Sequence, residues 1–135
     1  MLGKLFVSYR ADDEGSRYKN LLVGWSENPR LQFFDIKFED TSIGISINST
    51  NAAYIKRRIK EKIKESDRVI CIIGRNTYDS EWVNWEIETA KELNKPIVAI
   101  KINRFYDTPL ALYNKNVKWA YSFTYATIRK ALLDF

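Results

Sequence analysis

The sequence predicts an α/β fold in which helices cover both faces of a parallel β-sheet. Strand-like and helix-like segments alternate five times along its 135 residues, which is the order expected for such a sheet. Residues 68–74, RVICIIG, form a continuous apolar run rich in β-branched side chains. A run of this kind is typical of a central strand that is buried on both faces.

The expected strands are short segments rich in apolar, aromatic or β-branched residues. They are residues 4–9, 31–38, 68–74, 96–102 and 117–123. In open parallel sheets, ligands bind beyond the carboxyl ends of the strands, where the strand order reverses. The expected ligand site therefore lies among residues 8–10, 37–48, 74–76 and 103–104.

The first and last helices are expected to pack an apolar stripe on the sheet, because their apolar residues recur at helical spacing. The stripe of the first helix, which should be capped near Ser16, consists of Tyr18, Leu21, Leu22 and Trp25. The stripe of the last helix, within 124–135, consists of Ile128, Ala131, Leu132 and Phe135. Residues 103–116 are expected to be a long connection with a short helical turn.

A second helix is expected over residues 51–66, with Ser49 or Thr50 as its cap. Its buried stripe consists of Ile55, Ile59 and Ile63. Its basic residues are Lys56, Arg57, Arg58, Lys60, Lys62 and Lys64. The interleaved isoleucines make this a solvated helix face, and the absence of interleaved aromatic residues disfavours single-stranded nucleic acid as a partner.

Length and composition exclude several kinds of site. The length suits one domain, residues 1–135. The chain has no histidine, which excludes His-based acid–base and nucleophilic chemistry and most zinc sites, so no metal is expected. The single cysteine, Cys71, is expected to be a buried small side chain. No segment is expected to cross a membrane or to be a signal peptide, and the expected location is cytoplasmic.

Residues 80–93, SEWVNWEIETAKEL, predict an amphipathic helix with one unusual carboxylate. Its buried stripe should contain Val83, Ile87 and Ala90, and its solvent-facing carboxylates should be Glu81, Glu88 and Glu92. Glu86 lies only about 60° from the centre of the buried stripe, one turn after Trp82. A carboxylate at the rim of a core has either a basic partner or a function in a site, and the helix alone favours the basic partner.

Side chains suited to binding a nucleotide gather at the predicted strand ends. They are Phe6, Ser8, Tyr9 and Arg10 from the first strand, Asp40 and Ser46 after the second, and Trp82 and Glu86 after the third. Aromatic rings can stack on a base, Arg10 could bind a pyrophosphate, and a carboxylate could stabilise an oxocarbenium-like centre. An ordinary polar surface explains the same residues, and composition alone does not choose between the two interpretations. Neither the P-loop nor the Rossmann glycine motif is present.

Two segments resemble the conserved boxes of Toll/interleukin-1 receptor (TIR) domains. LFVSYR, followed by acidic residues, resembles the first-strand box. SEWVNWEIETA resembles the S-x-W-C-x-x-E-L segment, with Ser80, Trp82, Glu86 and Ile87 in register. The TIR-like proteins of bacterial Thoeris anti-phage defence systems are the more similar group, because FDIKFED (34–40) and the pair Arg17 and Trp25 also match.

The resemblance implies a flavodoxin-like fold with a five-stranded parallel sheet, and NAD as a substrate rather than a cofactor. It implies that Glu86 is the catalytic residue and that Ser8, Tyr9 and Arg10 contact the substrate. Nicotinamide would be released, and a cyclic or modified ADP-ribose would activate a separate effector protein after phage infection. Self-assembly or a phage component would be the trigger.

The sequence departs from the TIR pattern at two places. Val83 replaces the usual Cys, and the final Phe-Trp box has only a loose counterpart in SF at 122–123. Two alternatives stay open. The first is a non-catalytic TIR-like interaction module, and the second is an N-glycosidic enzyme that resembles nucleoside deoxyribosyltransferases.

Overall fold

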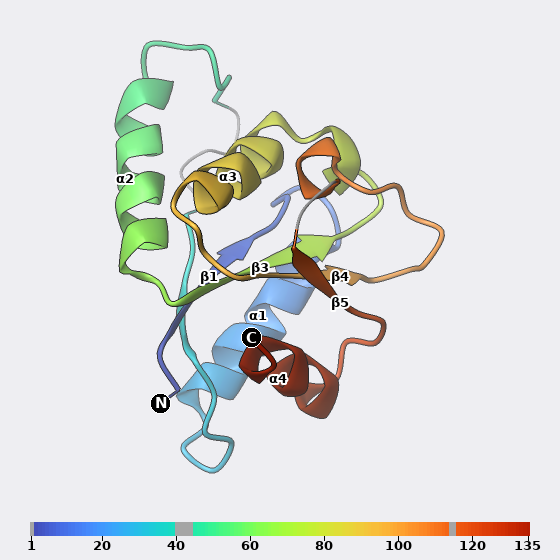
Figure 1. Ribbon diagram of the computed structural model, residues 1–135. Helices are drawn as coiled ribbons and strands as arrows, with labels where there is room; N and C mark the ends of the chain where they lie inside the picture. Colours follow the sequence, from blue (N-terminus) through green and yellow to red (C-terminus); the bar gives the residue numbers. More distant parts are fainter. Residues whose placement is uncertain (1, 40–44, 114–115) are drawn as a thin grey trace.

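A parallel five-stranded sheet forms the middle layer of the computed structural model, which describes residues 2–39, 45–113 and 116–135 (Figure 1). The strands are β1 (Lys4–Ser8), β2 (Asp35–Lys37), β3 (Arg68–Ile73), β4 (Ile97–Lys101) and β5 (Val117–Ala120). Their order across the sheet is β2-β1-β3-β4-β5, and every pair is parallel. This is the strand order of flavodoxin-like proteins, so the predicted fold class is confirmed.

Two helices cover each face of this sheet (Figure 1). One face carries α2 (Ala52–Glu65) and α3 (Glu81–Glu92), and the other carries α1 (Gly15–Glu27) and α4 (Tyr125–Leu133). Two short 3-10 helices, η1 (Thr77–Asp79) and η2 (Leu110–Leu112), lie in the connections after β3 and β4. The second one is the helical turn that was predicted in the long connection.

The strand order reverses between β1 and β3. The chain leaves β1 to form β2 on one side of it, and then returns to form β3 on its other side. The registers Leu5↔Arg68 and Ser8↔Cys71 align β1 with β3, so both strands end at the same edge of the sheet. The connections after these two strands leave in opposite directions, which opens a crevice at this edge.

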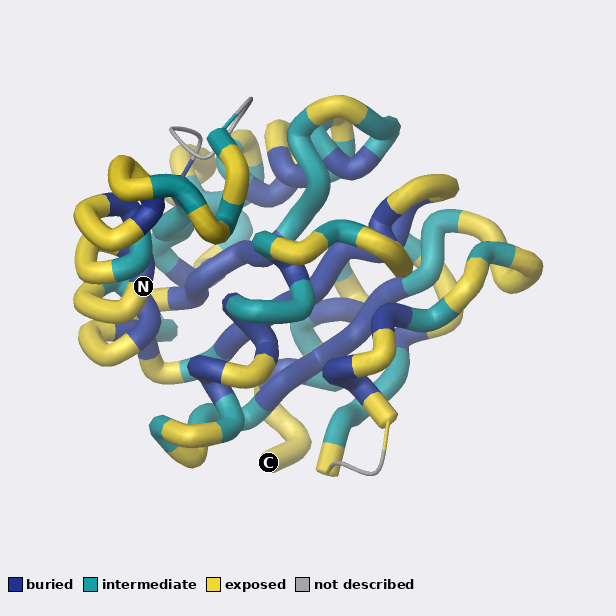
Figure 2. Tube along the Cα trace, turned by 90° about the horizontal axis from the view of Figure 1, so that it is seen from above, coloured by how far each residue is buried: buried dark blue, intermediate teal, exposed yellow. Residues whose placement is uncertain are grey.

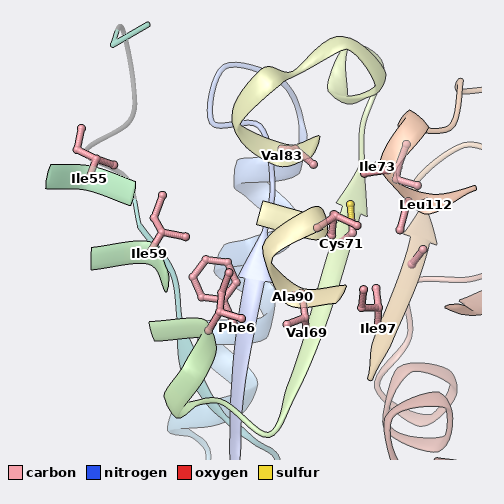
Figure 3. Close-up of a cluster of buried hydrophobic side chains, with 14 residues drawn as sticks. Phe6, Ile55, Ile59, Val69, Cys71, Ile73, Val83, Ala90, Ile97 and Leu112 are labelled. Carbon is pink, nitrogen blue, oxygen red and sulfur yellow. The ribbon is translucent and has the colours of Figure 1, made fainter. Parts of the chain in front are cut away.

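The core between the sheet and α2 and α3 contains Phe6 (Figure 3). Its ring packs among the buried stripe of α2, formed by Ile55, Ile59 and Ile63, and the buried stripe of α3, formed by Val83, Ile87 and Ala90. Cys71 belongs to the same core and its side chain is completely buried, as predicted. The helical stripes predicted from spacing for α2 and α3 are therefore confirmed.

The opposite core is built from Leu22 of α1 and from Ile128 and Leu132 of α4, against Val7 and Ile72. Two predicted members of these stripes are wrong, because Leu21 and Phe135 are both 45% exposed. Leu21 is replaced in the buried set of α1 by Lys19, and Phe135 follows the end of α4. Figure 2 shows the resulting pattern, with the sheet buried and the outer faces of the helices exposed.

Several element boundaries also differ from the prediction. The second strand begins at Asp35, because Phe33 and Phe34 use their rings to fill the core before the ladder starts. Neither α1 nor α2 has a side-chain cap, so the predicted caps at Ser16 and at Ser49 or Thr50 are wrong. Ser80, in contrast, caps α3 by accepting a hydrogen bond from the Val83 N–H at 3.2 Å.

No helix within the described residues is long and apolar enough to cross a membrane.

Candidate functional site

A pocket of about 430 Å³ opens at the crevice between β1 and β3. Its wall includes Tyr9 and Arg10 from the end of β1, Ile45 and Ser46 from the connection after β2, and Trp82 from the first turn of α3. These segments meet because parallel strands bring their carboxyl ends to one edge of the sheet. The size falls in the range usual for small-molecule sites.

Carboxylates outnumber cations in the wall of this pocket, which we call the acidic pocket. Its carboxylates are Asp12, Glu39, Asp79 and Glu81, and its one cation among the described lining residues is Arg10. Sequence reasoning missed Glu39, Asp79 and Glu81 as site residues. Glu39 lies within the FDIKFED segment, so that segment was the signal that could have found it.

Glu86 lies beside this pocket and is more deeply buried than a rim carboxylate. Its side chain accepts a hydrogen bond from the Ser8 hydroxyl at 2.7 Å, and the residue is 5% exposed. Burial raises the pKa of Glu86 to about 8, while the Ser8 hydrogen bond works against that rise. Within the described part of the chain, Glu86 forms no ion pair, so the basic partner favoured by the helix alone is not found.

Helix α3 fixes the position of Glu86 from two directions. Its buried stripe holds the helix on the sheet, and the Ser80 cap fixes the first turn. Trp82, one turn before Glu86, donates its indole N–H to the Ile45 carbonyl at 2.8 Å. The same helix therefore carries both Trp82, which is bonded to the connection after β2, and Glu86, which is bonded to Ser8 of β1.

Glu39 is a second buried carboxylate near the site. It forms ion pairs with Arg58 and Lys62 of α2, each at 3.2 Å, and its side chain is 3% exposed. The negative charge of Glu39 adds to the rise in the pKa of Glu86, and the positive charge of Lys62 opposes it. The basic face of α2 thus contributes two cations to the back of the site instead of forming only a solvated surface.

Arg10 is held in place by two carboxylates. Its guanidinium donates to Asp12 at 2.6 Å and to Asp79 at 2.7 Å, and it also donates to the Asn76 carbonyl at 2.7 Å. The hydrogen bond from Arg10 lowers the pKa of Asp12 below its ordinary value. An anionic group that binds Arg10 has to compete with these two partners.

Asp13 joins the two connections that form the crevice. Its carboxylate accepts hydrogen bonds from the Thr77 hydroxyl at 2.8 Å and from the Gly15 N–H at 2.8 Å. A Cβ atom at Gly74 would lie 2.7 Å from the same carboxylate, so this contact requires glycine. Asp13 therefore fixes the connection after β1 against the connection after β3.

The structure brings together most of the predicted site residues. Tyr9, Arg10, Ser46 and Trp82 line the acidic pocket, and Ser8 and Glu86 are bonded to each other beside it. Phe6 and Ser8 require a correction as predicted substrate contacts, because both are completely buried and neither lines the pocket. Phe6 lies in the core instead. Its position in β1 points it toward the hydrophobic stripes of α2 and α3. Asp40 lies outside the described residues.

Comparison with protein families decides which family this fold and site represent. The model of the TIR-like domain of Thoeris protein ThsB matches residues 6–106, which run from within β1 to beyond the end of β4. This chain belongs to that family. Comparison with curated proteins finds no matching relative.

Solved structures share the fold of this TIR-like domain at low sequence identity. A CMP N-glycosidase, BcmB, from Clostridium botulinum is 14% identical with a TM-score of 0.60, over 98% of this chain and 99% of that one. A 2-deoxyribosyltransferase from Bacillus psychrosaccharolyticus is 16% identical with a TM-score of 0.59, over 78% and 77%. A 3-dehydroquinate dehydratase-like protein from Bifidobacterium longum is 12% identical with a TM-score of 0.51, over 98% of each chain. At these identities the likeness concerns the fold alone.

Proposed function

We propose that this Thoeris TIR-like domain cleaves NAD, releases nicotinamide and converts the remainder into an ADP-ribose-derived signal. The observation that carries the proposal is the buried carboxyl of Glu86, held by Ser8 beside a pocket at the reversal of strand order. A carboxylate at such a place can stabilise positive charge that develops as a glycosidic bond breaks. Family membership supports the defence context.

The charge of the acidic pocket supports the nicotinamide end of NAD as the group that enters it. The nicotinamide ring of oxidised NAD is a cation. Three cations, Arg10, Arg58 and Lys62, pair with three of the four lining carboxylates, which leaves a small excess of negative charge that favours a cation over an anion. Tyr9 and Trp82 offer aromatic faces to such a ring. The pyrophosphate is then placed toward Arg10, where it competes with Asp12 and Asp79.

The charge of the substrate also bears on the protonation of Glu86. With a pKa of about 8, most Glu86 side chains carry a proton at neutral pH. A cationic ring nearby favours the charged carboxylate and so lowers that pKa. Binding of oxidised NAD is therefore expected to convert Glu86 into its reactive, ionised form, whereas a neutral base gives no such help.

The proposed reaction requires neither a metal nor a redox cofactor to account for its electrons and protons. The bond between C1′ of the ribose and the nicotinamide nitrogen breaks, and its electron pair stays on nicotinamide, which becomes neutral. The ionised Glu86 stabilises the positive charge left on C1′. A hydroxyl group then attacks C1′ and loses its proton to solvent, or a ring nitrogen of adenine attacks C1′ and the adjoining exocyclic amino group loses the proton; either route yields a cyclic or modified ADP-ribose. This product would activate a separate effector protein, with a phage component or self-assembly as the trigger.

A second candidate is cleavage of the N-glycosidic bond of a nucleoside or nucleotide with a neutral base. The observation that favours it is the shared fold with the CMP N-glycosidase and the 2-deoxyribosyltransferase. The same Ser8–Glu86 pair would serve this reaction. The two candidates differ in the charge of the leaving base, so the substrate that the protein turns over distinguishes them.

The deciding experiment is mass spectrometry of small molecules after incubation of the protein with NAD, CMP or deoxynucleosides. Glu86→Gln removes the carboxylate, and Glu92→Gln is the matched control, because Glu92 is exposed on the same helix. Lysates of infected and uninfected cells that express each form are run in parallel, so that a required trigger is supplied.

Nicotinamide and a new ADP-ribose species in the wild type and in Glu92→Gln, absent in Glu86→Gln, would establish the proposed reaction. Turnover of CMP or deoxynucleosides with intact NAD would select the second candidate. Intact substrates in every sample, with the fold confirmed by circular dichroism, would contradict both and leave the interaction module.

A further inference from the structure

A second pocket, of about 610 Å³, lies at the same edge of the sheet but beyond β4 and β5. It is lined by Lys101, Ile102, Arg104, Thr108, Trp119 and Tyr121. Lys101 is the last residue of β4, and Trp119 and Tyr121 flank the end of β5. The connection that follows β4 extends away from the sheet beside this place (Figure 1). We call it the basic pocket.

The lining of the basic pocket carries positive charge without compensation. Among the described residues, it contains two cations and no carboxylate. Within the described ranges, neither Lys101 nor Arg104 forms an ion pair with an acidic side chain. Each cation lies over an aromatic ring instead: Lys101 Nζ is 5.9 Å from the Trp119 centroid, and the Arg104 guanidinium is 4.8 Å from the Phe105 centroid. Two unneutralised cations in a concave site favour an anionic ligand.

The two aromatic rings that line this pocket differ in how far they are buried. Tyr121 is 86% exposed, so its burial cannot stabilise the native state substantially. Trp119 is partly buried, which fixes its ring against the core of α3 while one part stays accessible. A fixed ring beside an exposed one is a suitable surface for a flat, aromatic ligand.

We propose that the basic pocket binds a nucleotide, with its base against Trp119 and Tyr121 and its phosphate on Lys101 and Arg104. A nucleotide combines the two properties that the lining selects, because it has a flat π-face and a negatively charged group. Stacking on aromatic side chains tolerates any base, so the pocket specifies the class of ligand more than the base. Thr108 adds one hydroxyl group that can donate to a phosphate oxygen or accept from a ribose hydroxyl.

This site is independent of the proposed NAD cleavage. None of its lining residues belongs to the acidic pocket, and none contacts Glu86 through a hydrogen bond or ion pair within the described residues. Binding there can therefore be measured whether or not the protein turns over NAD.

The test is isothermal titration calorimetry with AMP as the probe, against the purified wild-type protein. Adenosine and inorganic phosphate are titrated separately, because each supplies only one of the two recognised groups. Arg104→Ala and Tyr121→Ala remove exposed side chains of the pocket, and neither change is expected to disturb the fold. Arg57→Ala is the matched control, because Arg57 is exposed on α2 and its loss changes the net charge equally.

AMP is expected to bind, and each pocket variant is expected to weaken binding by about tenfold, while Arg57→Ala has no such effect. Adenosine and phosphate should each bind more weakly than AMP. Amide chemical-shift changes on addition of AMP should fall on residues 101–108 and 119–121. Absence of AMP binding, equal binding to wild type and both pocket variants, or an equal loss in Arg57→Ala would overturn the proposal.

Discussion

The acidic and basic pockets lie at the same edge of one sheet and have opposite charge. Among the residues that the structure describes, the acidic pocket, beyond β1 and β3, has one lining cation against four carboxylates, and the basic pocket, beyond β4 and β5, has two cations and no carboxylate. Both are built from residues at or after strand ends, so the sheet determines where the pockets lie. The connections that follow each strand determine what each pocket can bind.

The two pockets also differ in how firmly their polar groups are held. In the acidic pocket, Arg10 is bonded to two carboxylates, Glu39 to two cations and the neighbouring Glu86 to Ser8. In the basic pocket, the side chains of Lys101 and Arg104 lie over aromatic rings and form no ion pair among the described residues. Fixed groups suit a reaction, which needs reacting atoms held in place, and adaptable groups suit reversible binding.

The largest expected effect concerns Glu86. Glu86→Gln keeps the shape and the contact with Ser8 but removes the ionisable group. Nicotinamide release is expected to fall by about a hundredfold or more, as for loss of a group that stabilises charge in the transition state. The rate is measured by chromatography of nicotinamide under the triggering condition, with Glu92→Gln as the control. A Glu86→Gln rate within a few-fold of the control would contradict a catalytic role.

The next effect is a pH dependence that belongs to the acidic site. The pKa of Glu86 is about 8 in the folded chain and near its ordinary value of 4.5 when unfolded. Between these values the unfolded state has lost a proton that the folded state keeps, so the free energy of unfolding falls as pH rises through this window. The expected loss is a few kcal/mol, measured by urea unfolding at pH 5 to pH 9. Glu86→Gln should lack this part of the loss, and parallel curves for the two proteins would be the contrary result.

A smaller effect is expected where Asp13 fixes the wall of the crevice. Gly74→Ala would place a Cβ atom 2.7 Å from a carboxylate that Thr77 and Gly15 hold in position. The expected cost is about 1–3 kcal/mol of unfolding free energy, as for other overpacked sites. Gly24→Ala is the control, because nothing lies within 4 Å of its Cβ, and this exposed helical site should gain up to about 1 kcal/mol. Equal values for the two variants would show that the Asp13 contact does not constrain Gly74.

The smallest effect concerns the indole of Trp82. Trp82→Phe keeps an aromatic ring in the pocket wall but removes the N–H that donates to Ile45. We expect a loss of about 1 kcal/mol in chemical unfolding. Trp85→Phe is the matched control on the same helix, because its indole N–H donates no hydrogen bond among the described residues. A cost no larger than that of the control would mean that the bond does not fix the connection after β2.

The sequence alone was sufficient for the layers of the fold. Spacing placed Ile55, Ile59 and Ile63 on one buried stripe, and the run at 68–74 gave the central strand. Periodicity wrongly placed Leu21 in the buried stripe of α1 and missed Lys19, because it does not reveal which neighbouring residues cover a helix face. Lys19 is buried, with its Nζ 4.0 Å from the centroid of the Phe38 ring and 5.3 Å from that of the Tyr9 ring, and both of these residues lie outside α1.

The sequence also limited the chemistry available to the site: without histidine, a carboxylate is the candidate for stabilising charge, and the TIR-like segment predicts Glu86 for that role. Only the tertiary structure decided that Glu86 faces Ser8, 78 positions away, and that Phe6 lies in the core. It also decided that the four carboxylates form one pocket and that Lys101 and Arg104 form another. The physical reason is that a residue's type fixes its possible interactions, whereas burial, pKa and charge balance depend on neighbours that only strand order brings together.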